Sequence, residues 1–376
     1  MSPFTPSLRI FLSVDIVGST AFKQSAADGK AGKGASAEDE FPRSEPWFEP
    51  IAQFYRGVER TFSKEWSICE EKANSINWPT GPSPELWKSI GDEVIYTKHL
   101  TDHREVLSTL YAWVSTVRSY RKILRTQFKT LDLKSTAWIA GFPVHNAEVI
   151  FRPSVKNGAG VVEEDDELYS NLQLLHEFYE DREKQMHFTR DFIGPAIDTG
   201  FRLAQMSTPR RMVLSLELAL MLGHAIGLHL LHKPQTFDYE ELSFFFAGRQ
   251  SFKRVFGGLP YPIFWIDMKP SPSLEGKEDE LQNLQPLKTE LVYKFCTEFV
   301  REHDAYCFTP YIMGNQHPAF ADMPERHTRR IEVLRNYWVD ESLKRTDEKA
   351  AGLAKNEQGA ATEQKTAERV LKEILK

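Results

Sequence analysis

The chain opens with a regular alternation of apolar and polar positions. Apolar residues occupy every second position from Leu8 to Ile16, and Arg9, Ser13 and Asp15 lie among the residues between them. An alternation with a period of two predicts a β-strand with one face toward the core. The alternation stops at Val17-Gly18-Ser19-Thr20, where we expect a turn that leads into a helix.

The remaining pattern changes between helical and strand-like segments. Apolar residues three and four positions apart predict helices at 48–66 and 106–123, and the segment 87–96 predicts a tight hairpin that turns at Gly91. The run strand–helix–strand–strand–helix–strand predicts an α+β fold with a ferredoxin-like palm core, an antiparallel-rich sheet flanked by helices and a helical C-terminal extension. We expect further strands in 135–151, 212–214, 244–247 and 263–267, and further helices from Pro195 to about Met206, from Ser215 onward, at 288–301 and at 325–345.

Changes in composition divide the chain. We interpret residues 1–269 as one domain, with polar loop insertions at about 24–46 and 153–187. Residues 270–345 are expected to form the helical extension. Residues 346–376 are rich in Ala, Glu and Lys, so we expect a polar tail that is helical or disordered.

Charge and cysteine content restrict the partners and the compartment. The formal net charge of −6 argues against a broad nucleic-acid-binding surface. Cys69, Cys296 and Cys307 lack metal-ligand spacing, which fits a reducing cytoplasm and argues against structural zinc. No run of about 18 apolar residues and no signal-peptide pattern occurs, so we expect a cytoplasmic protein without membrane insertion.

Two aspartates stand where chemistry is expected. Asp15 ends the first strand and Asp92 lies at the hairpin tip. Phosphoryl transfer uses carboxylate oxygens to hold two divalent ions about 3.5–4 Å apart, and the N–H groups of Gly18, Ser19 and Thr20 suit phosphate oxygens at a helix start. In the alternative interpretation, Asp15 caps a helix and Asp92 is an ordinary turn residue.

Three motifs together resemble the class III adenylyl and guanylyl cyclases. They are Asp15-Ile16-Val17-Gly18-Ser19-Thr20, Lys88-Ser89-Ile90-Gly91-Asp92-Glu93, and Asp191-Phe192-Ile193-Gly194-Pro195 followed by Arg202. The resemblance covers about residues 8–268, with 135–150 similar to the central strand pair of the family. It implies a class III cyclase catalytic fold over residues 1–269, in an enzyme that closes a nucleoside triphosphate into a 3′,5′-cyclic monophosphate and releases diphosphate.

The resemblance also implies a role for each matched residue. Asp15, Asp92 and the backbone carbonyl of Ile16 would bind two Mn²⁺ or Mg²⁺ ions, and Arg202 would stabilise charge on the α-phosphate. The residues that would contact the nucleotide are Gly18, Ser19, Thr20, Lys88, Asp191 and Phe192, together with Lys253 or Arg254 as the phosphate-binding residue late in the domain. An exposed hairpin without a phosphate role is the alternative for Lys253 and Arg254.

The chain departs from the family pattern at Asp198, where adenylyl cyclases usually have Asn. Asp198 either orients Arg202 or contacts the ribose, or else forms a surface ion pair with Arg202 worth about 0.3–0.5 kcal/mol. In the family, the metal aspartates come from one protomer and the arginine and base-binding residues from the other. The resemblance therefore implies a homodimer with two composite sites.

The base is not decided by the chemistry of the base-binding pair. Lys88 donates and Asp191 accepts hydrogen bonds, which suits adenine, uracil and cytosine better than guanine. Bulky neighbours, Trp87, Phe192 and Tyr96, favour a single-ring base. The histidines at 224, 229 and 232 have a spacing that does not converge on a metal.

A finer resemblance favours a pyrimidine base. The acidic insertion before Asp191, the acid at Asp198 and the C-terminal extension are similar to the Pycsar pyrimidine cyclases of bacterial anti-phage defence. That resemblance implies conversion of UTP to cyclic UMP, which would activate a downstream effector during infection. Cyclic CMP or cyclic AMP synthesis and a catalytically silent nucleotide sensor are the alternatives.

Overall fold

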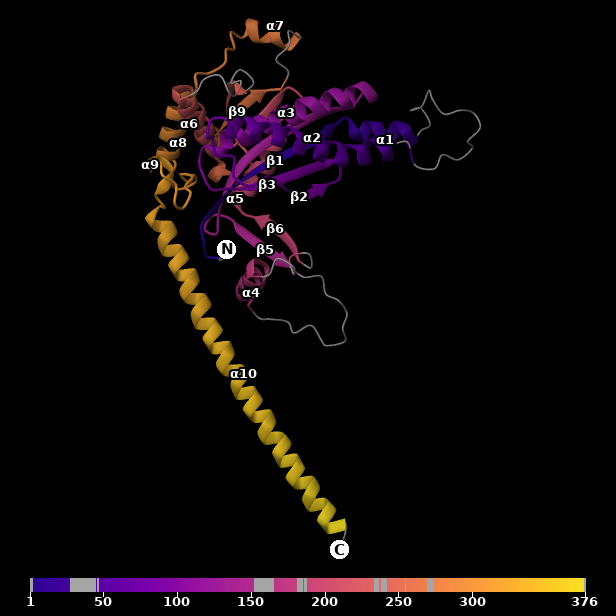
Figure 1. Ribbon diagram of the computed structural model, residues 1–376, viewed down its shortest axis with the longest axis vertical. Helices are drawn as coiled ribbons and strands as arrows, with labels where there is room; N and C mark the ends of the chain where they lie inside the picture. The colour runs from indigo at the N-terminus through magenta and orange to yellow at the C-terminus, as the bar shows by residue number, and fades with distance from the viewer. Residues whose placement is uncertain are drawn as a thin grey trace, which may run out of the picture. The chain divides into compact units, whose positions relative to one another are not determined.

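The computed structural model describes residues 3–27, 45, 47–151, 166–180, 185, 188–232, 237, 242–253, 255–268 and 274–374. The contacts divide the chain into two compact units. Figure 1 labels many of the helices and strands of the chain. The larger unit comprises Pro6–Val149 and Arg190–Pro324, and the smaller unit comprises Met1–Thr5, Ile150–Thr189 and Glu325–Lys376.

A seven-stranded sheet organises the larger unit, in the order β2-β3-β1-β4-β7-β9-β8. Neighbouring strands are antiparallel except for the parallel pair β4 and β7. With the helices on its faces, this sheet confirms the predicted α+β fold with an antiparallel-rich sheet. The strands are β1 (Ser7–Val17), β2 (Glu85–Ile90), β3 (Glu93–Leu100), β4 (Asp132–Phe142), β7 (Arg211–Leu214), β8 (Phe244–Gln250) and β9 (Tyr261–Asp267).

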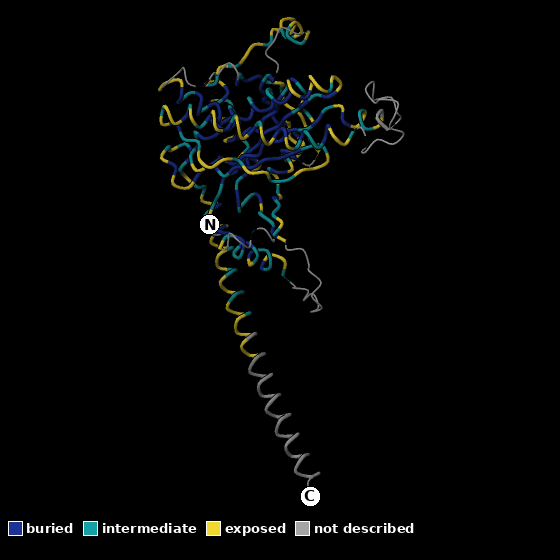
Figure 2. Tube along the Cα trace, turned by 45° about the vertical axis from the view of Figure 1, so that its right-hand side comes forward, coloured by how far each residue is buried: buried dark blue, intermediate teal, exposed yellow. Residues whose placement is uncertain are grey.

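One face of the sheet is covered by long helices. The apolar residues at even positions of β1, including Leu12 and Val14, belong to one large core cluster with residues of α2 and α3, which pack against each other. The buried residues concentrate in the interior of the larger unit (Figure 2). The long helices that contribute to this cluster are α2 (Phe48–Asn74), α3 (Glu105–Gln127), α6 (Leu216–His232) and α8 (Thr289–Glu302).

The other face carries a smaller aromatic cluster beneath α5 (Pro195–Ala204). The rings of Phe11 and Trp138 are stacked with centroids 5.4 Å apart, and Phe192 meets Phe11 edge-on. Gly200 lies against Trp138, since a Cβ at that position would come within 2.3 Å of the indole. The absence of a side chain at Gly200 therefore brings α5 close to the sheet.

The predicted strand pair in 135–151 forms in a different way. β4 is in the large sheet, whereas β5 (Ala147–Phe151) pairs with β6 (Thr189–Ile193) in a separate two-stranded sheet. The neighbours of β4 in the large sheet are β1 and β7, so the segment that follows β4 in the chain does not extend that sheet. The remaining helices are α1 (Ser19–Ala27), α4 (Glu167–Glu180), α7 (Leu274–Leu281), α9 (Pro318–Ala321) and α10 (Glu325–Ile374), with a short 3₁₀ turn at Phe256–Gly258.

The smaller unit contains α4 and α10, which contact each other. Tyr169 of α4 stacks on Trp338 of α10 with ring centroids 4.9 Å apart, and the Tyr337 hydroxyl donates a hydrogen bond to Asp166. The helix predicted at 325–345 continues to Ile374. Within the described residues, none of the helices combines the length and the apolar character that a bilayer crossing requires.

A buried ion pair holds the start of α3 against β3. Lys98 of β3 and Glu105 of α3 are in contact, and their side chains are 0% and 1% exposed. Glu105 also accepts hydrogen bonds from the Thr101 hydroxyl and from the backbone N–H of Asp102. Burial lowers the pKa of Lys98, and the charge of Glu105 opposes that change. The pair therefore depends on both partners being present.

Replacement of Glu105 by Gln tests this dependence. Removing the carboxylate leaves the Lys98 ammonium buried without its counter-charge, so we expect the free energy of unfolding to fall by about 3–5 kcal/mol. Urea unfolding followed by circular dichroism measures it. The double variant Lys98→Met/Glu105→Gln should regain most of the loss; a single variant as stable as the wild type contradicts the interpretation.

Candidate functional site

Asp15 lies near the end of β1, an interior strand of the sheet between β3 and β4. It lies opposite Glu93 of the neighbouring strand β3 and opposite Lys134 of the neighbouring strand β4. Residues directly opposite each other in neighbouring strands point to the same face. The Lys134 Nζ is accordingly 3.0 Å from Asp15 Oδ2, and Ser13, two residues before Asp15, donates a hydrogen bond from its hydroxyl to Glu93.

Asp92 joins this group from the β2–β3 turn. Its carbonyl oxygen accepts a hydrogen bond from the Ile16 N–H at 3.2 Å, and its carboxylate accepts one from the Ser19 hydroxyl. Lys23 of α1 lies 3.7 Å from the same carboxylate. The turn depends on Gly91, which has a φ of +63°. We refer to Asp15, Asp92 and Glu93 as the carboxylate cluster.

Gly18 sets the path from β1 into α1. It has a φ of +88°, and a Cβ there would come within 2.8 Å of the Thr130 carbonyl oxygen. Any other residue would be strained at this position. Ser19 therefore begins α1 directly after the strand, buried beside Asp92, while Thr20 is exposed. The first N–H groups of α1 have no partner within the helix, as at any helix start.

The cluster concentrates negative charge at a half-buried position. Burial raises the pKa of Asp15; the hydrogen bond and charge of Lys134 oppose this, and the charge of Asp92 adds to it. Burial also raises the pKa of Glu93, with a further contribution from Asp15, while the hydrogen bond from Ser13 opposes the change. Negative charges that raise the pKa of a neighbouring carboxyl group form a site where a bound cation is stabilising.

Asp15 and Asp92 offer hard oxygen ligands of the kind that Mg²⁺ and Mn²⁺ prefer. Ile16 belongs to the large core cluster, so its side chain does not serve the site and only its backbone carbonyl could be a ligand. Within the described residues, no three His, Cys, Asp or Glu side chains are arranged to hold a metal ion. A metal at Asp15 and Asp92 would thus need further oxygen ligands from the backbone, a substrate or water.

A second polar group lies on the same face of the sheet. Lys88 of β2 pairs with Ile95, which is two residues, or about 7 Å, along β3 from Glu93. Lys88 Nζ is 2.8 Å from Asp191 Oδ1 of β6, which also accepts the Phe192 N–H at 2.9 Å. Both side chains are about one-third exposed, so a ligand can reach the pair.

The aromatic neighbours of this pair are placed differently from one another. The Trp87 ring centroid is 4.1 Å from Lys88 Nζ. Phe192 is only 2% exposed and its ring lies inside the aromatic cluster, where it supports the pair from below. The interpretation that Tyr96 narrows a base pocket was wrong. Tyr96 alternates with Ile95, so it lies in the core on the opposite face and its hydroxyl donates to Glu59.

The structure does not bring Arg202 to the carboxylate cluster of its own chain. Arg202 and Asp198 are exposed on α5, and no hydrogen bond or ion pair connects them to each other or to the cluster among the residues described here. The surface ion pair considered from the sequence is therefore not formed. Lys253 is exposed after β8, and Arg254 lies outside the described residues.

Sequence reasoning gave no role to several neighbours of these groups. Lys134 and Ser13 are recognisable only from the register of β1 with β3 and β4. Arg9 and Arg190 both contact Glu85, and each guanidinium lies 5.2 Å from the Phe192 ring centroid. Burial alone would raise the pKa of Glu85, but the charges and hydrogen bonds of the two arginines hold that pKa below its usual range. This network ties β2 to the strand that carries Asp191.

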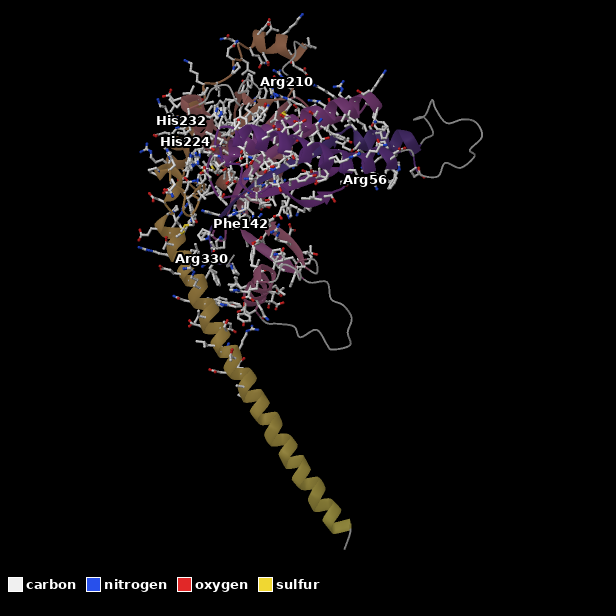
Figure 3. The ribbon with its side chains drawn as sticks, viewed as in Figure 1. Arg56, Phe142, Arg210, His224, His232 and Arg330 are labelled. Atoms are coloured by element: carbon white, nitrogen blue, oxygen red, sulfur yellow. The ribbon has the colours of Figure 1, made fainter. Side chains whose placement is uncertain are left out.

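The histidines of α6 have separate environments. His224 and His232 are labelled in Figure 3. His224 packs against His103 and His317, with ring centroids 5.2 and 4.4 Å away, whereas His229 packs against Trp78. Burial lowers the pKa of His224 and of His229 to about 4. We therefore expect both to be neutral near pH 7.

Comparison with known proteins gives weak structural likenesses. No protein-family model and no curated protein sequence matches the chain. The fold is similar to the adenylyl cyclase CyaB from P. aeruginosa, with 11% identity over 71% of this chain and 96% of that chain and a TM-score of 0.38. It is also similar to the guanylyl cyclase Cya2, with 9% identity over 71% and 93% and a TM-score of 0.32.

A third solved structure with a similar fold is the guanylate cyclase domain of RhGC from Catenaria anguillulae in complex with GTP. Its identity is 10% over 70% of this chain and 97% of that chain, with a TM-score of 0.32. Because all three TM-scores are low, we base the function on the residues of this chain.

Replacement of Lys134 by Met tests the charge balance of the cluster. The pKa of Asp15 is raised in the folded state, so protonated Asp15 favours folding, and this stabilisation is lost as the pH rises through that pKa. Without Lys134 the pKa would be raised further, and the stability lost on ionisation of Asp15 would be larger. We expect wild type and variant to be equally stable near pH 4 and to differ by about 1 kcal/mol at pH 7. Urea unfolding at both pH values measures this.

Lys294→Met is the matched control, because Lys294 forms an exposed pair with Glu290 on α8. We expect this control to change stability little at either pH. A Lys134 variant whose stability difference from the wild type does not grow with pH contradicts the interpretation.

Proposed function

We propose that this protein is a metal-dependent nucleotidyl cyclase. The observation that carries the proposal is the convergence of Asp15 and Asp92 near the end of β1, on a sheet face that also carries Lys88, the partner of Asp191. Carboxylates for cations and a donor–acceptor pair for a base are the two requirements of a nucleotide site. Their motifs are those that resemble class III cyclases.

The residues divide the work of cyclisation between them. The N–H groups of Gly18, Ser19 and Thr20 bind phosphate oxygens at the start of α1. Lys88 and Asp191 bind the base edge and fix the nucleoside, so that its 3′-oxygen can attack the α-phosphorus as diphosphate leaves. Mn²⁺ or Mg²⁺ held by Asp15, Asp92 and the Ile16 carbonyl would activate the 3′-hydroxyl and neutralise the triphosphate.

We propose that the active protein is a homodimer. Arg202 is exposed on α5 and has no partner among the described residues of its own chain. This fits a residue that serves the carboxylate cluster of a second copy, where it would stabilise charge on the α-phosphate. Asp198, one turn earlier on the same helix, would orient Arg202 or contact the ribose. Lys253 or Arg254 would bind the β- and γ-phosphates.

Our preferred substrate is UTP, with cyclic UMP as a second messenger that activates an effector in anti-phage defence. The support comes from the sequence resemblance to the Pycsar cyclases and from Trp87, which lies directly against Lys88 and would narrow the base site. CTP and ATP are alternative substrates. A silent nucleotide sensor is the alternative of another class.

Incubation of the purified protein with UTP, CTP, ATP and GTP in the presence of Mn²⁺ tests the substrate. We expect cyclic UMP as the main product by chromatography and mass spectrometry. Cyclic CMP or cyclic AMP as the main product would refute UTP as the preferred substrate but would still support the proposal that the protein is a nucleotidyl cyclase. Nucleotide binding by calorimetry without any cyclic product would favour the sensor.

In the same assay, Asp15→Asn and Asp92→Asn should each lower kcat at least about a hundredfold. The reason is that a metal ion supplies several kcal/mol of transition-state stabilisation, and about 1.4 kcal/mol corresponds to a factor of ten. Asp304→Asn, an exposed aspartate after α8, is the matched control and should stay active. Near-normal turnover by either cluster variant would refute the metal assignment.

Mixing two inactive variants tests the composite site. If Asp15 and Arg202 serve one site from different protomers, equal amounts of Asp15→Asn and Arg202→Ala should form heterodimers with one intact site. Random exchange would restore about a quarter of the wild-type activity. Asp15→Asn mixed with Asp92→Asn is the matched control. This mixture should stay inactive, because both replacements affect the metal-binding half of the site and every site therefore lacks one of the two aspartates. A lack of recovery in heterodimers detected by native mass spectrometry contradicts the shared site.

A further inference from the structure

A pocket of about 160 Å³ opens in the larger unit beside the first turn of α5. It is lined by Asp198 of α5, Glu217 of α6, Ile139 of β4 and residues of the segments around 256 and 306–308. Ile139 is five residues along β4 from Lys134, which corresponds to about 16 Å. The pocket is therefore separate from the carboxylate cluster.

Aromatic rings form the walls of this pocket. His145 and Phe308 lie on one side with ring centroids 5.4 Å apart, and Phe256 and Tyr306 lie together with centroids also 5.4 Å apart. Ring faces carry partial negative charge and attract organic cations, most strongly where water is excluded. An arrangement of several rings around one small space is a common way to bind an ammonium group.

The polar lining residues are acidic or neutral. Glu217 is only 8% exposed, and its carboxyl group is hydrogen-bonded by Ser215 and Tyr261. Burial raises the pKa of Glu217 to about 7. Asp198 adds a second carboxylate, and no Lys or Arg lines the pocket within the described part of the chain. A buried carboxylate without a nearby cation is costly, and a bound cation would relieve that cost.

We propose that this pocket binds a small organic ammonium cation, with the aromatic rings around its alkyl groups and Glu217 as its counter-charge. The volume matches the ligand: a cavity of about 150 Å³ holds a molecule the size of benzene, and a trimethylammonium group is of that order. α5 forms one wall of the pocket, so an occupant would restrict the movement of α5. This helix also carries Arg202, which lies one turn after Asp198.

Calorimetric titration with choline near pH 8 tests the proposal, because choline has a neutral isostere of the same shape, 3,3-dimethylbutan-1-ol. We expect saturable binding of one choline per chain and at least tenfold weaker binding of the isostere. Glu217→Gln keeps the shape but removes the charge, so it should weaken choline binding at least tenfold. Glu278→Gln, an exposed acid on α7, is the matched control and should bind as the wild type does.

A second variant keeps the test decisive if Glu217→Gln does not fold. Tyr306 is 55% exposed, so Tyr306→Leu should leave the fold intact. It removes one aromatic ring, and we expect it to weaken choline binding several-fold while binding of the isostere stays the same. The proposal is overturned by equal affinity for choline and its isostere, by wild-type affinity in a folded Glu217→Gln, or by no saturable binding at millimolar choline.

Discussion

The register of β1 between β3 and β4 is the constraint on which the rest of the structure depends. It places Leu12 and Val14 in the core on one face and Ser13 and Asp15 on the other. A slip of one residue would exchange these two sets and turn Asp15 toward the apolar core beneath α2 and α3. The energy of the whole apolar core beneath α2 and α3 therefore maintains the position of a single carboxylate.

The parts of the site that follow from local pattern could be predicted from the sequence. The alternation in β1 places Asp15 off the apolar face, and the tight turn at Gly91 places Asp92 at a hairpin tip. Both statements depend only on residues close in the chain. The side of the sheet that Tyr96 faces also follows from local alternation. Its aromatic character nevertheless led to the prediction that it lines a base pocket, whereas it lies in the core.

The remaining parts depend on long-range pairing, which a single sequence does not encode locally. Lys134 meets Asp15 only because β4 is antiparallel to β1 in one register. Likewise, β5 pairs with β6, which follows a long intervening segment, and not with the preceding strand β4. The ring of Phe192 is buried because β6 passes over the aromatic cluster, and nothing in its flanking residues indicates this. The pocket beside α5 is assembled in the same way, because its lining residues come from segments far apart in the chain, from Ile139 to Phe308.

The irregular β2 has a consequence for the behaviour of the protein at high concentration. β2 is an edge strand, with Leu86 and Ile90 54% and 46% exposed, and an exposed apolar edge is a template for strand addition by another copy. The pairing of β2 with β3 is interrupted by a bulge between Leu86 and Lys88. A bulge twists the strand, and a lysine on an edge disfavours close approach of a second sheet. The local geometry that presents Lys88 to a ligand thereby also protects the protein against edge-to-edge aggregation.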